Sequence, residues 1–121
     1  MPFDSLPAEV PVRHAAEIAI LDRMAKLLAT PERWCKHDYT NGLWGKKRAF
    51  CLDAALHMAA REELAFSLNR PDSERRVEAT FVRLLRGTAR ERIHHYNDHG
   101  ATKHKSILAL IARARREFEG V

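Results

Sequence analysis

The chain has 121 residues, with 21 Lys or Arg against 16 Asp or Glu, so its formal net charge is +5. This length suits one domain that buries roughly two thirds of its unfolded surface and folds without disulfides or metal. The two cysteines form no CxxC pair and the longest apolar run is six residues, which argues against a disulfide-stapled secreted protein and a membrane span, and favours the cytoplasm.

The most apolar stretch lies in the middle of the chain. From Phe50 to Ala60, nine of eleven residues are apolar, and the exceptions are Asp53 and His57. A helix that is apolar nearly all round has to be covered on several sides. The sequence therefore predicts a central buried helix, over about residues 47–61, with the other helices packed around it.

The rest of the pattern is also helical. Residues 1–10 have no helical period and are predicted to form a tail before one helical domain over 11–121. Further helices are expected over residues 11–29, 72–86, 89–96 and 102–119, with a short turn after Thr30 that brings Trp34 to the core. Asn41-Gly42 is a hairpin signal, so a small β-hairpin is possible near residues 37–45. The predicted fold class is all-α, a single domain of four to five helices.

Four short motifs follow one another along the chain. They are Arg33-Trp34-Cys35, Phe50-Cys51-Leu52-Asp53-Ala54-Ala55-Leu56, Tyr96-Asn97-Asp98, and an aliphatic last helix. The pattern resembles an uncharacterised family of small bacterial and phage-associated proteins with Trp-Cys, Cys-Leu-x-Gly-Ala-Leu and aromatic-Asn-Asp motifs. The chain departs from it at Ala54, usually glycine, and at Tyr96, often tryptophan. The resemblance spans about residues 15–115, implies no activity, and favours an accessory protein over a metabolic enzyme.

Two groups of polar residues are candidates for a polar site. Asp53 and His57 lie one helical turn apart, as a carboxylate that orients an imidazole does in hydrolases and metal sites. The simpler interpretation is a solvent edge or a satisfied contact between helices, because no nucleophile accompanies the pair. His95, Asp98 and His99 surround a second candidate position.

The second group lies in a predicted turn. The simplest interpretation of residues 97–100 is a helix end, with Asn97 or Gly100 in the left-handed cap and Asp98 bonded to the start of the next helix. No catalytic residue is predicted, and the chain is expected not to be an enzyme.

Metal binding would draw on two sets of side chains. One set is Cys35, His37, Cys51 and His57, and the other is His94, His95, His99 and His104. Neither has the short paired spacings of structural zinc, so no metal and no cofactor are predicted. Cys51, between Phe50 and Leu52, is expected to be a small buried core residue.

Basic residues gather in two regions. The first interleaves aromatic residues with Lys46, Lys47 and Arg48, which could stack bases and hold phosphates or simply face water. The second holds Arg75, Arg76, Arg83, Arg86 and Arg90 on one helix face and beyond it, followed by further cations in the last helix, namely Lys103, Lys105, Arg113, Arg115 and Arg116. No helix-turn-helix is evident, so any contact with nucleic acid would be made to phosphates.

These observations favour a non-catalytic interaction or regulatory protein. We expect a phage or mobile-element accessory factor, for example one that inhibits a host system, which docks a basic face on a protein or a protein–nucleic-acid complex. The alternative is a sequence-tolerant nucleic-acid-binding protein, and the third hypothesis is a small metal-dependent hydrolase using Asp53, His57 and the histidine cluster. The sequence leaves the oligomeric state open, and a dimer is possible.

Overall fold

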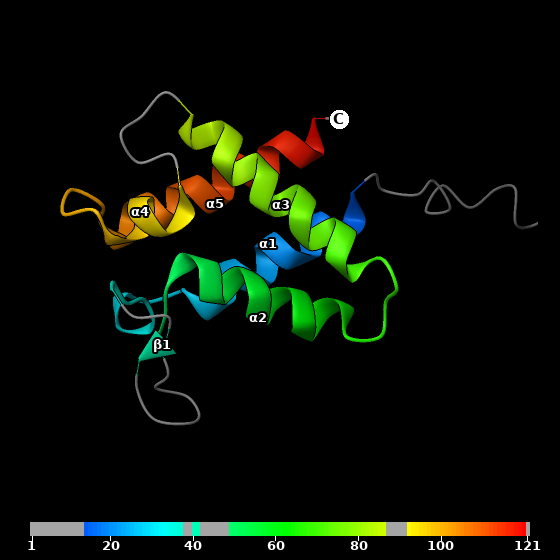
Figure 1. Ribbon diagram of the computed structural model, residues 1–121, viewed down its shortest axis with the longest axis horizontal. Helices are drawn as coiled ribbons and strands as arrows, with labels where there is room; N and C mark the ends of the chain where they lie inside the picture. The colour runs from blue at the N-terminus through cyan, green and yellow to red at the C-terminus, as the bar shows by residue number, and fades with distance from the viewer. Residues whose placement is uncertain (1–13, 38–39, 42–48, 87–91, 121) are drawn as a thin grey trace, which may run out of the picture.

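The computed structural model describes residues 14–37, 40–41, 49–86 and 92–120, and within these ranges the chain is mostly helical (Figure 1). The helices are α1 (Ala15–Leu27), α2 (Leu52–Leu64), α3 (Arg70–Leu85), α4 (Ile93–Asp98) and α5 (His104–Glu119), with a 3-10 turn η3 (Pro31–Arg33) and two short strands β1 (Thr40–Asn41) and β2 (Ala49–Phe50). The predicted all-α fold is confirmed. None of the helices in the described ranges is long and apolar enough to cross a membrane.

Helix α1 has the most central position. It packs against α2, α3 and α5, and its side chains at Ile20, Leu21 and Met24 are completely buried. Their spacing of one, three and four residues forms a continuous apolar stripe on one side of the helix. Helix α2 packs mainly against α1, α3 and α4, whereas α5 rests mainly on α1 and α3. The expectation that every helix surrounds α2 is therefore too simple, because α1 shares the central place.

Helix α2 begins later than predicted. The residues before it, Ala49 and Phe50, are extended and form β2, so the predicted start near residue 47 is wrong. Cys51 is the N-cap, and its Sγ accepts a hydrogen bond of 3.4 Å from the Ala54 N–H. Leu52 and Leu56 are fully buried, as the apolar pattern predicts.

The predicted β-hairpin is present, but its second strand, at residues 49–50, lies beyond the predicted range of residues 37–45. β1 pairs antiparallel with β2, with Thr40 opposite Phe50 and Asn41 opposite Ala49. Asn41 thus lies in a strand and not in a two-residue turn with Gly42, and the connection, residues 42–48, lies outside the described residues. Phe50 also bridges Trp34, which joins the ribbon to the segment after η3.

Helices α2 and α3 form a pair joined by a short turn (Figure 1). α3 begins at Arg70, two residues before the predicted start at residue 72, because Pro71 is well suited to the first helical turn, where its missing N–H is not needed. α4 covers the other end of this pair through contacts with both helices.

Candidate functional site

The predicted pair Asp53 and His57 faces the gap between α2 and α3. His57 Nδ1 donates to Glu74 Oε2 at 2.7 Å, and His57 Nε2 lies 3.4 Å from Asp53 Oδ1. Asp53 and His57 are one turn apart on α2, and Glu74 comes from the first turns of α3. The side chains are 35%, 39% and 22% exposed, so water reaches all three. Sequence reasoning missed Glu74, because no local spacing links two separate helices.

The same gap forms an open groove. One part, of about 430 Å³, is lined by Asp53, Glu78, Val82, Arg92, Ile93 and His94. The next part, of about 300 Å³, is lined by His57, Arg61, Arg70 and Glu74. We call these residues together the α2–α3 groove. Acids and histidines line its middle and arginines its two ends, so it can offer charges of both signs to a ligand or partner.

The groove brings one imidazole and two carboxylates together. A Glu–His pair can orient an imidazole, but an acyl or phosphoryl transfer also needs a nucleophile or a metal ion. In the part of the chain that the structure describes, no group of three or more His, Cys, Asp or Glu side chains is placed to hold a metal. The imidazole of His57 is positioned mainly as a link between α2 and α3.

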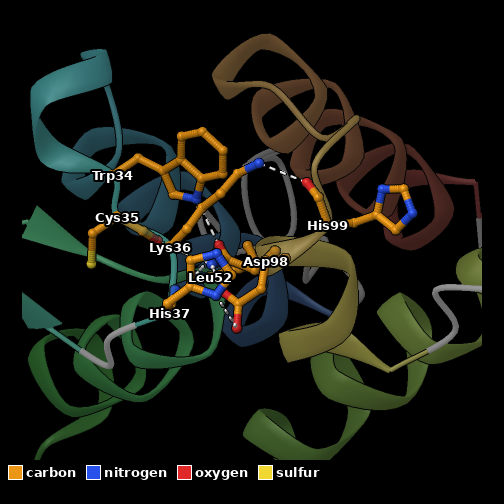
Figure 2. Close-up of polar contacts among 8 residues, drawn as sticks. Trp34, Cys35, Lys36, His37, Leu52, Asp98 and His99 are labelled. Carbon is orange, nitrogen blue, oxygen red and sulfur yellow. Dashed lines mark hydrogen bonds and ion pairs between the residues drawn. The ribbon is translucent and has the colours of Figure 1, made fainter.

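A second polar site is buried around Asn97, which is fully inaccessible to solvent. Its Oδ1 accepts from Trp34 Nε1 at 2.6 Å and from the Leu52 N–H at 3.0 Å, and its Nδ2 donates to the Cys35 carbonyl at 3.0 Å (Figure 2). Asn97 therefore joins α4 to the start of α2 and to the segment after η3. We call Trp34, Cys35, Leu52, Asn97 and Asp98 the Trp34–Asn97 cluster.

Asp98 extends the cluster to the segment that leads into β1. Its Oδ1 accepts from the His37 N–H at 2.7 Å and from Asn97 Nδ2 at 2.9 Å. Burial raises the pKa of Asp98, but these hydrogen bonds, with that from the His37 N–H first, outweigh it and hold the pKa below its usual value. His37 has φ of 65°, a left-handed conformation that directs its N–H to the carboxylate.

Lys36 closes the cluster on its outer side. Its Nζ donates to the His99 carbonyl at 2.6 Å and lies 5.4 Å from the centre of the Trp34 ring (Figure 2). This places the ammonium group within the range of a cation–π contact. The residues before β1 and those at the end of α4 are therefore held together by two separate sets of bonds.

The turn after α4 differs from the predicted one. Asn97 lies inside α4, and the non-glycine residues with positive φ in the described ranges are His14 and His37, so Asn97 does not form a left-handed cap. Asp98 bonds to His37, far back in the chain, and not to the start of the next helix. The helix does end here as expected, with His99 as its C-cap.

The four clustered histidines do not converge on one point. The ring centres of His94 and His95 are 4.2 Å apart, and the rings contact each other. His99 Nδ1 accepts a hydrogen bond of 3.1 Å from the Ala101 N–H. His104 Nε2 donates to the Leu28 carbonyl at 2.6 Å. Asp98 belongs to the Trp34–Asn97 cluster and Asp53 to the α2–α3 groove, so the predicted polar residues do not form a single site.

Cys35 and Cys51 form no disulfide, and Cys51 is buried, as expected. Burial raises the pKa of the Cys51 thiol, so the reactive thiolate is scarce near neutral pH. The Cys51 side chain thus acts as the N-cap of α2.

Most arginines on α3 are paired with acids. Arg75 contacts Asp72, Arg83 contacts Glu117 at 2.7 Å, and Arg76 Nε lies 3.4 Å from Glu17. Arg86 is exposed, and Lys46, Lys47, Arg48 and Arg90 lie outside the described residues. The predicted basic face of α3 is therefore partly neutralised.

Helix α5 carries three cations on one face that have no ion pair with a described residue. Lys105, Arg113 and Arg116 are exposed and make no ion pair with any described residue. They share the outer face with Ala109 and Ala112, because positions eight and eleven residues apart return to one side of a helix. We call these five residues the α5 basic face.

The buried acid Glu17 is a further polar residue that sequence reasoning missed. It is 3% exposed and contacts His14 Nδ1 at 3.0 Å and Arg76 Nε at 3.4 Å. Burial raises its pKa, but hydrogen bonds from Ser73 and His14 and the charge of Arg76 outweigh it, so the pKa is lowered. The group ties the start of α1 to α3.

Comparison with known proteins identifies the family of the chain but no characterised relative. No curated protein and no solved structure matches the chain. The family match covers residues 13–117, which include the Trp34–Asn97 cluster, the α2–α3 groove and nearly all of α5. The chain belongs to the family of unknown function DUF6197.

Proposed function

We propose that the protein is a non-catalytic interaction protein that docks on a macromolecular partner with an acidic surface through the α5 basic face. The observation that carries the proposal is the contrast between the paired arginines of α3 and the three unpaired cations of α5. A cation already held by a neighbouring acid gains less from a new anionic partner than one that faces only water.

The polar residues of the Trp34–Asn97 cluster and of the α2–α3 groove support the same proposal. Asn97 uses its amide in contacts within the chain, and His57 and Glu74 bond to each other across two helices. Both sets of contacts join separate helices, which suits side chains that hold the fold together. An accessory role in a phage or mobile element stays a prediction from the resemblance.

A nucleic acid is the second candidate partner. Lys105 and Arg116 are eleven residues apart, which spans roughly 16 Å along a helix, and only alanines and Arg113 lie between them on the outer face. Such a smooth cationic stripe can lie along a phosphate backbone without reading bases. Three phosphate contacts would lower the affinity for duplex DNA about 40-fold between 50 and 200 mM salt.

The test compares two triple variants with the same loss of charge. One is Lys105→Gln/Arg113→Gln/Arg116→Gln, and the control changes the paired arginines, Arg75→Gln/Arg76→Gln/Arg83→Gln. Both are titrated by fluorescence anisotropy against labelled duplex DNA, single-stranded RNA and polyglutamate, with circular dichroism as a check of folding.

We expect the α5 variant to lose at least tenfold in affinity and the α3 control less than threefold. Binding to polyglutamate alone would support an acidic protein partner, and binding to DNA or RNA with a steep salt dependence would support the second candidate. Equal losses in both variants, or no binding by the wild type at 50 mM salt, would overturn the docking of α5.

A further inference from the structure

Helices α2 and α3 face each other in matched pairs of residues. They run in opposite directions, and the hydrogen bond between His57 and Glu74 fixes their register (Figure 1). A position one turn back on α2 therefore faces a position one turn further on along α3. The residues that line the α2–α3 groove follow this rule. We call the three pairs the acid rung (Asp53 and Glu78), the middle rung (His57 and Glu74) and the arginine rung (Arg61 and Arg70).

The arginine rung is not neutralised within the described part of the chain. Arg61 and Arg70 line a part of the groove of about 300 Å³ and make no ion pair with any described residue. The acids nearest to them are paired with arginines outside this part, namely Glu62 and Glu63 with Arg23, and Asp72 with Arg75. Only the Glu74 carboxylate shares the lining, so its net charge is +1. The two guanidinium groups can therefore hold an anionic group of a ligand.

The acid rung carries the opposite sign. Asp53 and Glu78 line the part of about 430 Å³, where Arg92 is the one Lys or Arg among the lining residues, so its net charge is −1. Glu78 is exposed and makes no ion pair with any described residue. A neutral His57 carries one ring proton, which it donates within the middle rung, so the Asp53 carboxylate can still accept hydrogen bonds. The acid rung can therefore hold a cationic amine.

Like charges face each other at both ends of the groove. Two arginines form one rung and two acids the other, and each pair repels itself when the groove is empty. A surface that keeps like charges together gives up stability, which is a common cost of a binding site. The rungs are eight residues apart on each helix, or roughly 12 Å along the axis. A ligand with opposite charges at that separation would relieve the repulsion at both ends.

We infer that the α2–α3 groove binds a small zwitterion, with its anionic group on the arginine rung and its amine on the acid rung. An extended tripeptide with free ends has the required length, about 10 Å. Val82, which is 37% exposed, and Ile93 line the groove beside the acid rung and offer apolar surface to a side chain at the amine end. The inference does not use the α5 basic face, so the two proposals can fail independently.

The test is a titration of the ¹⁵N-labelled protein with leucylglycylglycine, up to about 10 mM, followed by the shifts of the amide signals in NMR spectra. The matched probes are the N-acetylated tripeptide, which lacks the amine, and the C-amidated tripeptide, which lacks the carboxylate. We expect a Kd of about 0.1–1 mM for the free tripeptide, with the largest shifts in α2 and α3. Each capped form should bind about fivefold more weakly, the effect of one exposed charge pair.

Variants assign each end of the ligand to its rung. Arg61→Gln/Arg70→Gln should bind the free and the C-amidated tripeptide equally and still prefer both to the N-acetylated form. Glu78→Gln should reduce the preference for the free over the N-acetylated form. The control Lys26→Gln/Arg83→Gln removes the same charge outside the groove and should bind all three probes as the wild type does.

Thermal unfolding separates binding from a structural role. Because the arginine rung repels itself, Arg61→Gln/Arg70→Gln should unfold at the wild-type temperature or above it. A lower unfolding temperature than that of the control would mean that these arginines serve the fold, and would overturn the inference. No shifts in the groove at 10 mM tripeptide, equal binding of the free and capped forms by the wild type, or equal losses in the control would overturn it as well.

Discussion

The Trp34–Asn97 cluster and the α2–α3 groove both gather polar residues, but they differ in burial. Asn97 is fully buried and bonded to three residues from two separate segments of the chain, whereas His57 and Glu74 are 39% and 22% exposed and line an open groove. A buried polar network has no access to water, so each lost partner is costly. In the groove, water replaces a lost partner. The two regions therefore predict different responses to substitution.

The largest effect should come from the centre of the cluster. Replacing Asn97→Ala leaves the Trp34 Nε1–H, the Leu52 N–H and the Cys35 carbonyl without their partner. We expect a loss of about 3 kcal/mol in the free energy of unfolding, because buried unsatisfied groups cost about 1–3 kcal/mol each and part of the site can relax. Urea unfolding monitored by circular dichroism measures it.

The control is Asn69→Ala, at the exposed N-cap residue of α3, whose side chain makes no capping hydrogen bond. It should change the free energy of unfolding by less than about 0.5 kcal/mol. Similar losses for Asn69→Ala and Asn97→Ala would show that the buried cluster contributes no more to the free energy of unfolding than an exposed asparagine does.

An intermediate effect should come from Asp98, at the partly exposed edge of the cluster. Its pKa is lowered in the folded protein, so its stabilising effect is complete above about pH 4, the unfolded value, and is lost as the pH falls toward the folded pKa. Asp98→Asn keeps an acceptor oxygen for the His37 N–H but removes the charge. We expect a loss of about 1 kcal/mol at pH 7.

The pH profile distinguishes charge from packing. Between pH 5 and about pH 3, the free energy of unfolding should fall less steeply for Asp98→Asn than for the wild type, because one fewer group takes up a proton on unfolding. Parallel profiles in urea titrations at these pH values would mean that Asp98 contributes no pH dependence.

The smallest effect should come from the groove. His57→Ala removes the contact with Glu74 and the weaker one with Asp53, but water can solvate both carboxylates. We expect a loss below about 1 kcal/mol and an unchanged circular dichroism spectrum. A loss as large as that of Asn97→Ala would show that the groove is a second structural centre.

The contrast also explains what the sequence could predict. The apolar pattern indicated the helices and the burial of Leu52 and Leu56, because such periodicity is local. It could not indicate that Asn97 meets Trp34, or that Glu74 meets His57, since these pairs join residues from different elements. Asn97 was interpreted as a turn residue for the same reason: a single polar residue near a helix end has the same local pattern whether it is exposed or buried.

The Trp34–Asn97 hydrogen bond also has a consequence for the order of folding. It joins residues 63 apart, and the bond from Asn97 to Leu52 joins residues 45 apart. Closing such long loops costs chain entropy before any contact compensates for it, whereas helices form from neighbours within microseconds. The cluster should therefore form late, after α1 and α2 have paired. Its hydrogen bonds would then be largely absent from the transition state, so they would slow unfolding and leave the rate of folding nearly unchanged.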